Sequence, residues 1–221
     1  MTLILTALCK NGICVCADKM EKTKHKNGTV VLRDDLYKIH KFRNFPLVIY
    51  NHGVNKFGEK SWKTLCSDYE ASNRWDYKNL EQISEDFRGF VNMDVGSQLI
   101  SNLNNFHKDE DLRMSFFNLS CKNTQKNRYE MLELCWSIDS GGVHFKSDLH
   151  RGFIRSGDGK KYLEEYIKSK NEIGSLNYWE GMNIRQAKDI LTRSFFIAVN
   201  EKNLSGGNEF SDNFDIECIL G

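Results

Sequence analysis

The sequence predicts an α+β protein in which layers of helices cover two packed sheets. Strand-like and helix-like segments occur in separate blocks, in the order strands, two helices, strands, two helices and a last strand. A single proline and the lack of any Pro/Gly/Ser-rich linker among 221 residues favour one domain over residues 1–221. Hydrophobic residues make up 40% of the chain, which is enough to build a substantial core.

The first block of strands begins near the N-terminus. Residues 2–8 are mostly apolar, Asn11-Gly12 is a two-residue hairpin signal, and residues 13–17 form the apolar return strand. Because this return strand is apolar on both faces, we expect it near the centre of a sheet. The charged residues 21–27 predict a loop. Further short strands are expected at residues 30–32, 38–42 and 47–50.

Apolar residues at helical spacing mark the helices of the chain. The clearest helix covers residues 184–199, where one apolar stripe runs along the whole segment. The other predicted helices cover residues 57–69, 80–106 and 159–168. The remaining strands are expected at residues 114–119, 129–138, 143–145, 152–154 and 210–220, with turns at 122–127 and at Gly141-Gly142.

Charge and hydropathy narrow the class of protein. Lys and Arg number 31 and Asp and Glu 30, so a formal net charge of +1 predicts no general attraction to nucleic acid or to an anionic membrane. No apolar run approaches the ~18 residues of a membrane span. Residues 1–8 lack the basic segment of a secretory leader. We therefore expect a cytoplasmic protein that binds neither nucleic acid nor membrane.

The cysteine pattern predicts reduced thiols. The seven cysteines are Cys9, Cys14, Cys16, Cys66, Cys121, Cys135 and Cys218. An odd number without a leader is a poor disulfide framework. Cys14 and Cys16 are expected as buried thiols on one face of a strand. No second Cys or His pair follows at ligand spacing, so we expect no metal site and no cofactor.

Thr2, Asp18 and Lys38 are candidates for a nucleophile and the groups that activate it. The initiator Met1 is usually removed before a small residue, which would leave Thr2 with both a hydroxyl and a free α-amine. An α-amine has an ordinary pKa of about 8, which suits a general base. A lysine ammonium nearby would lower that pKa, and a carboxylate would hold the lysine. Taken alone, these residue types also fit an N-terminal edge strand with surface charges.

The surrounding residues resemble the opening of proteasome β subunits and their bacterial relatives. Residues 2–19 contain an N-terminal Thr, a Gly-containing hairpin and an apolar strand that ends in Ala-Asp, and Lys38-Ile39 looks like the family's Lys-Ile strand. The resemblance implies an N-terminal nucleophile hydrolase, folded as a four-layer αββα sandwich. In that fold Thr2 is the nucleophile, its own amine is the base, Lys38 tunes the amine and Asp18 orients Lys38.

Later segments extend the resemblance over nearly the whole chain. Residues 136–142 are similar to an Asp-Pro-Gly-type turn, residues 155–159 to a Gly-Ser-Gly turn, and residues 205–207 to a Ser-Gly-Gly turn after an amphipathic helix. By this resemblance Ser156 and Ser205 form hydrogen bonds around the amine of the nucleophile. A peptide substrate would lie as an added strand, held by main-chain hydrogen bonds.

The oxyanion hole departs from the pattern of the family. There the donor is a backbone N–H in a turn of small residues, whereas residues 50–53 of this chain read Tyr-Asn-His-Gly. We expect the donor to be the N–H of His52 or of Gly53. Alternatively, Asn51 and His52 line a modified pocket, or the His52 ring is simply exposed in a turn.

Two further departures concern charge. Lys202 stands where the family usually has Asp, three residues before Ser205, and this predicts a differently charged network around the serines. Residues 21–35 form a longer, lysine-rich segment than is typical, which we expect to be a solvated loop.

The resemblance implies a threonine endopeptidase that hydrolyses peptide bonds through an acyl-enzyme on Thr2, once Met1 is removed. It also implies a homo-oligomeric ring that acts on peptides or unfolded proteins. Any ATP-driven unfoldase would be a separate chain, because no Gly-x-x-x-x-Gly-Lys-Ser/Thr loop is present. In one alternative an amine resolves the same acyl-enzyme, which makes a peptide ligase or transpeptidase. In the other, the changes at residues 50–53 and 202 mark a catalytically silent structural subunit.

Overall fold

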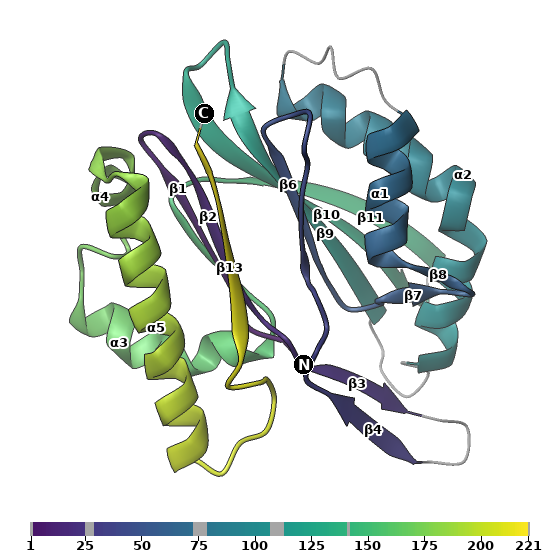
Figure 1. Ribbon diagram of the computed structural model, residues 1–221. Coiled ribbons are helices and arrows are strands. Elements are labelled where there is room, and N and C mark those ends of the chain that lie inside the picture. The colour runs from purple at the N-terminus through teal and green to yellow at the C-terminus, as the bar shows by residue number, and fades with distance from the viewer. Residues whose placement is uncertain (1, 25–28, 73–78, 107–112, 141, 221) are drawn as a thin grey trace. The chain divides into compact units, whose positions relative to one another are not determined.

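A computed structural model describes residues 2–24, 29–72, 79–106, 113–140 and 142–220 of the chain (Figure 1). The chain divides into two compact units, one formed by Met1–Ile39 with Arg151–Gly221 and the other by His40–His150. Each unit contains an antiparallel sheet with helices packed against it. The protein is therefore of mixed α and β structure, as the separate blocks of strands and helices predict. That residues 1–221 form a single domain stays a prediction.

The sheet of the first unit has four strands in the order β12-β1-β2-β13. Their bounds are β1 Ile4–Cys9, β2 Gly12–Asp18, β12 Phe153–Ser156 and β13 Phe214–Leu220. The predicted hairpin between β1 and β2 is confirmed, although its turn lies at Lys10-Asn11, one residue earlier than expected. Gly12 instead opens β2, where a Cβ would lie only 2.3 Å from the carbonyl oxygen of Ile219. A residue without a side chain is thus required for β13 to pair with β2 at that point.

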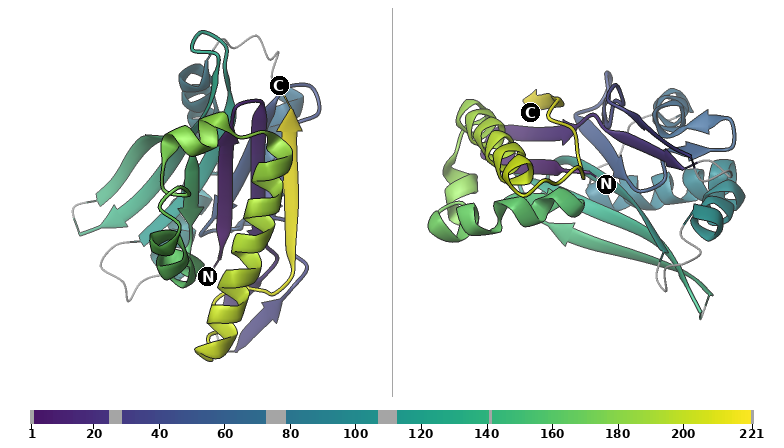
Figure 2. Two further views of the ribbon diagram at one scale, coloured as in Figure 1. Left: turned by 90° about the vertical axis from the view of Figure 1, so that its left-hand side faces the viewer. Right: turned by 90° about the horizontal axis from the view of Figure 1, so that it is seen from below.

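Helices cover one face of this sheet, and the longest of them, α5, runs along it (Figure 2). The helical segments are the 3₁₀ turn Asp158–Leu163, α3 Glu164–Ser169, α4 Leu176–Gly181 and α5 Ile184–Leu204. Asn183 caps α5 in a capping box with Gln186, which fixes where the helix begins. The predicted apolar stripe is confirmed, because Leu191 and Phe195 are fully buried in the same cluster as Leu5 of the sheet. Helix α4 was not predicted.

The second unit has a five-stranded sheet in the order β11-β10-β9-β6-β5. The bounds are β5 Ile39–Lys41, β6 Leu47–His52, β9 Arg113–Asn123, β10 Arg128–Asp139 and β11 Gly142–His150. Helices α1 (Trp62–Ser72) and α2 (Leu80–Phe106) supply its core with Tyr69 and Phe87, which contact edge to face at 4.9 Å between ring centroids. The bounds predicted for α2 are confirmed. Over the described residues, no helix is both long and apolar enough to cross a membrane.

Two small hairpins differ from the prediction. The expected loop over residues 21–27 is partly wrong, because β3 (Glu21–Lys24) pairs with β4 (Val30–Arg33) and only residues 25–28 lie outside the described chain. These strands contain Thr23, Val30 and Val31, and such β-branched residues are common in strands. The helix predicted from residue 57 begins at Trp62, because β7 (Lys56–Phe57) pairs with β8 (Lys60–Ser61). Gly141 of the predicted turn lies outside the described residues.

The expectation that all cysteines are reduced is wrong for two of them. Cys14 of β2 and Cys218 of β13 form a disulfide, with Cα atoms 4.3 Å apart. The antiparallel register of β2 and β13 places these residues directly opposite each other. The bridge joins positions separated by 204 residues, so spacing along the sequence gives no sign of it. Cys16, expected beside Cys14 as a buried thiol, is confirmed as free and buried.

Candidate active site

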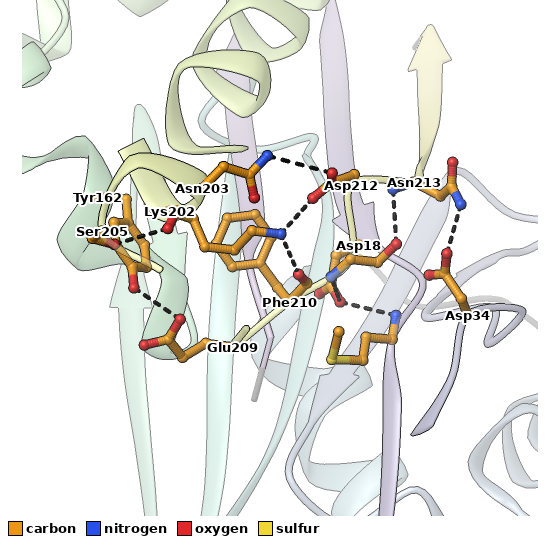
Figure 3. A network of polar contacts seen from close by, with 12 residues as sticks. Asp18, Asp34, Tyr162, Lys202, Asn203, Ser205, Glu209, Phe210, Asp212 and Asn213 are labelled. Atoms are coloured by element: carbon orange, nitrogen blue, oxygen red, sulfur yellow. Dashed lines mark hydrogen bonds and ion pairs between the residues drawn. The ribbon is translucent and has the colours of Figure 1, made fainter. Parts of the chain in front are cut away.

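Asp18, the last residue of β2, is the buried carboxylate of the candidate site. Its side chain is fully buried and accepts three backbone N–H groups: Leu3 at 2.8 Å to Oδ1, and Met20 at 2.9 Å and Ser211 at 3.3 Å to Oδ2. Figure 3 shows Asp18 beside the segment that carries Phe210 and Asp212. These donors come from both ends of the unit's chain and hold the carboxylate in one orientation.

The Lys38 ammonium bridges Asp18 and Thr2. Its Nζ lies 2.8 Å from Oδ1 of Asp18 and 2.8 Å from Oγ1 of Thr2. Because Nζ donates to the threonine oxygen, the hydroxyl proton of Thr2 remains available for another acceptor. Lys38 is 2% exposed and Thr2 is 6% exposed, so water screens these contacts little.

The charge state of Lys38 is set by two opposed effects. Burial lowers the pKa of its ammonium from the ordinary value of 10.5, while the carboxylates of Asp18, Glu21 and Asp34 raise it, and burial prevails. A buried cation of this kind stabilises negative charge in its surroundings. It also disfavours a second positive charge, such as a protonated amine on the adjacent Thr2.

The main chain of Thr2 is held by the turn after β12. The N–H of Gly159 donates to the Thr2 carbonyl oxygen at 3.0 Å. Gly157 has φ +84° and packs so closely that a Cβ there would lie 2.2 Å from the same oxygen. This turn, which resembles a Gly-Ser-Gly turn in the sequence, thus needs glycine for both its backbone conformation and its contact with Thr2.

Gly157→Ala is expected to destabilise the protein and displace Thr2. The left-handed backbone alone costs about 1–3 kcal/mol, and the overlap with the Thr2 carbonyl adds to it. Urea unfolding measures the loss. The matched control is Gly89→Ala in α2, where nothing lies within 4 Å of an added Cβ and stability should not fall. Equal stability of the two variants would contradict the packing described here.

The two serines that are expected near the Thr2 amine lie in different settings. Ser156 is 5% exposed, ends β12 and pairs with Ile4, two residues beyond Thr2. Ser205 follows α5, is exposed, and donates its hydroxyl to the carbonyl oxygen of Lys202 at 2.8 Å. Among the described residues no hydrogen bond joins Ser205 to Thr2. The catalytic roles of both serines stay predictions.

Lys202 does not leave its surroundings short of a carboxylate. It is 4% exposed and forms an ion pair with Asp212, ten residues further along the chain. Hydrogen bonding to Lys202 lowers the pKa of Asp212. The carboxylate that the resembled family usually has at position 202 is therefore absent. The lysine at this position pairs instead with an acidic residue, Asp212, on the following loop.

The expected oxyanion donors belong to the second unit. His52 ends β6, its ring stacks on Phe116 at 4.3 Å between centroids, and its Nε2 lies 3.8 Å from the carboxylate of Glu133. Gly53 has φ +108°, a conformation that favours glycine. The role of either N–H stays a prediction.

Sequence reasoning missed the contribution of Ser211. Its buried N–H completes the set of donors on Asp18, and its hydroxyl accepts the N–H of Asn213 at 2.7 Å. No sequence signal identifies a residue that acts through its main chain, so only the fold reveals it.

Solved structures with a similar fold exist for this chain. Two of the solved structures similar to it are Anbu proteins. Anbu (ancestral beta-subunit) from Yersinia bercovieri aligns with a TM-score of 0.60 and 13% identity over 99% of this chain and 82% of that chain. The Anbu (Gly-1) mutant from Hyphomicrobium sp. strain MC1 aligns with a TM-score of 0.56 and 12% identity over 98% and 80%. At such low identity the likeness concerns the fold alone.

Comparisons of sequence give no family. No family model matches the chain. A stretch of 101 residues is 29% identical to the glycine–tRNA ligase beta subunit of Rickettsia bellii in two strains, OSU 85-389 and RML369-C. That match covers 40% of this chain and only 15% of the ligase subunits. So short a match shows neither a family nor an activity for this chain.

The membership predicted from the N-terminal motifs therefore needs correction. The motifs led to the proteasome β-subunit-like family, whereas the similar structures are Anbu proteins, which are related to proteasome β subunits but distinct from them. Short motifs in the right order identify a shared scaffold, and they do not separate the families that are built on it.

Proposed function

We propose that the chain is a threonine peptidase of the N-terminal nucleophile type, with Thr2 as nucleophile after removal of Met1. The observation that carries the proposal is the buried Lys38 ammonium, 2.8 Å from both Oγ1 of Thr2 and Oδ1 of Asp18. Removal of Met1 creates an α-amine on Thr2, beside the fixed cation. The cation lowers the pKa of that amine and leaves it neutral at pH 7, as a general base must be.

The proposed reaction has two halves. The Thr2 amine takes the proton of Oγ1 as this oxygen attacks the peptide carbonyl carbon, and the oxyanion is held by the N–H of His52 or Gly53. The C–N bond then breaks, the amine's proton passes to the leaving group, and an ester on Thr2 remains. Water adds to the ester carbonyl carbon and gives one proton to the same amine. The bond between this carbon and Oγ1 then breaks, the amine returns the proton to Oγ1, and the second product leaves as an acid.

We also propose the four-layer αββα arrangement and a homo-oligomeric ring acting on peptides or unfolded proteins. In each unit helices cover one face of a sheet, which is what the outer layers of such a sandwich require. The similar Anbu proteins carry the name of a beta-subunit, which favours an assembly. The mass of the particle in solution, measured by light scattering, tests the ring.

The direct test uses intact mass and a peptide epoxyketone, which reacts with the hydroxyl and the α-amine of a single residue. The native protein should lack Met1 and gain one equivalent of reagent. Thr2→Ser should still react, whereas Thr2→Ala, which also allows Met1 removal, should lose both labelling and peptide cleavage. A retained Met1, or equal labelling of Thr2→Ala, would overturn the proposal.

The same experiments separate the alternatives. A ligase or transpeptidase would give new amide products when an amine-bearing peptide is added, because the amine competes with water for the ester on Thr2. A silent structural subunit would remain unlabelled although its Met1 is removed.

A further inference from the structure

Lys202, a buried lysine near the end of α5, binds the loop that follows the helix. The Lys202 ammonium donates to the carbonyl oxygen of Phe210 at 2.8 Å, pairs with the carboxylate of Asp212, and lies 4.7 Å from the centroid of the Phe210 ring. Figure 3 shows the lysine reaching from the helix to this loop. Lysines are almost never this buried unless they are paired, so a specific role for its charge is indicated.

The residue between these two contacts connects the loop to the candidate site. Ser211 is 3% exposed, and its N–H donates to Oδ2 of Asp18 at 3.3 Å. This N–H belongs to the same peptide group as the Phe210 carbonyl. In a trans peptide the C=O and N–H point in opposite directions. A single peptide group therefore lies between the ammonium of Lys202 and the carboxylate of Asp18, and it bonds to both.

Through this chain of hydrogen bonds the charge of Lys202 affects the hydrogen bonding of Asp18. The cation on the carbonyl polarises the peptide group, and its N–H becomes a stronger donor. It also fixes the rotation of the peptide plane, on which the direction of the N–H depends. The loop has other anchors, Glu209 to Tyr162 at 2.8 Å and Asn213 to Asp34 at 2.6 Å, but these hold its flanks and not this peptide group.

We propose that Lys202 is a positioning residue, which orients Asp18, and through it Lys38, by holding the peptide group between Phe210 and Ser211. This inference rests on the proposed function for its catalytic consequence. Without the Lys202 cation the peptide group turns more freely and Asp18 loses part of its hydrogen bonding. Its negative charge then acts more strongly on the Lys38 ammonium, which moves the proton equilibrium of Lys38.

The pKa of Lys38 is expected to rise when Lys202 loses its charge. Losing the Ser211 donor leaves more negative charge facing Lys38, and losing the positive charge of Lys202 acts in the same sense, so the pKa of Lys38 rises. The other carboxylates that act on Lys38, Glu21 and Asp34, are unchanged in the test.

The test compares Lys202→Met with Asp212→Asn in the full chain. Lys202→Met keeps the length of the side chain but removes its charge. We expect the pKa of Lys38, followed by NMR of its ε-carbon, to rise, and the rate of Thr2 labelling at neutral pH to fall about tenfold. Asp212→Asn leaves the contact of Lys202 with the peptide group, and should change the rate less than about twofold.

Lys202→Arg keeps the cation and is expected to retain the pKa of Lys38. If Lys202→Met does not fold, Ser211→Pro removes the same hydrogen bond from the other end of the peptide group and should raise the pKa of Lys38 likewise. An unchanged Lys38 titration in the folded variant, or a shift in Asp212→Asn equal in size and opposite in sign, would overturn the proposal. The titration is readable even in a chain whose Thr2 does not react, so failure of the proposed function remains distinguishable.

Discussion

Lys38→Met is expected to abolish epoxyketone labelling of Thr2 and to destabilise the protein by about 3–5 kcal/mol, the usual cost of leaving one half of a buried ion pair. Methionine matches the length of lysine but brings no charge and no donor. Asp18, which is fully buried, would keep its backbone donors and lose its only cation within hydrogen-bond distance among the described residues. Urea unfolding measures the stability, and intact mass measures the labelling.

The double variant Lys38→Met/Asp18→Asn separates the two effects. Removing both charges takes away the uncompensated carboxylate, so part of the stability should return. The return is only partial because the Asn amide has a single oxygen, whereas both oxygens of Asp18 accept backbone N–H groups. Labelling should stay absent because no cation remains beside Thr2. Lys170→Met on the exposed surface is the matched control and should stay within about 0.5 kcal/mol of the native chain. A single variant Lys38→Met as stable as the native protein would show that the pair is not buried as described.

The variant Lys38→Met also tests how Lys38 makes the stability of the protein depend on pH. Burial lowers the pKa of Lys38 in the folded chain below its ordinary value of 10.5. Between the folded pKa and 10.5 the unfolded chain holds more protons than the folded chain, so Lys38 makes the free energy of unfolding rise with pH in that window. At lower pH Lys38 is protonated in both states and adds no pH dependence. The stability of the native chain minus that of Lys38→Met should therefore increase as pH rises towards 10.5. A decrease would mean that attraction by Asp18 outweighs burial.

Local pattern predicted much of the scaffold because the decisive contacts are near in sequence. The hairpin of β1 and β2 places Thr2 close to Asp18, since Ile4 pairs with Ala17. Helices α2 and α5 follow from apolar residues at helical spacing, which only a long amphipathic segment sustains. Lys38 is different, because its approach to Asp18 was expected only from the family resemblance and not from any periodicity.

What the sequence missed depends on the path of the irregular loop after α5. Ser211 reaches Asp18 through a backbone N–H, and 193 residues separate them. The partner of Lys202 is Asp212, on an irregular loop whose path follows from tertiary packing. The position of Ser205 was predicted from a three-residue motif, too short to determine where its hydroxyl points.

The disulfide between Cys14 and Cys218 is expected to stabilise the protein by about 2–5 kcal/mol, towards the upper end of this range because the loop it closes is long. Urea unfolding with and without a phosphine reductant measures the difference. Without reduction, alkylation of the unfolded chain should modify the five free cysteines, and after reduction all seven. Seven alkylated cysteines in the unreduced chain would contradict the bridge.

Two variants make the test specific. The double variant Cys14→Ala/Cys218→Ala should have the stability of the reduced chain and no longer respond to reductant. Cys16→Ala removes a buried sulfur from the same strand without touching the bridge, so it should lose stability yet respond to reductant as the native chain does. A response shared by all three proteins would point to an effect of the reductant other than on this bond.

Reduction should act first on β13. The bridge fixes Cys218 opposite Cys14, and the same register places Phe214 opposite Asp18. Only Asp212 and Asn213 lie between that strand and the peptide group that Lys202 holds. Hydrogen exchange should therefore speed up in residues 214–220 on reduction, while the Ser211 N–H, anchored independently by Lys202, stays protected. If both exchange together, the strand and not the lysine sets the position of Ser211.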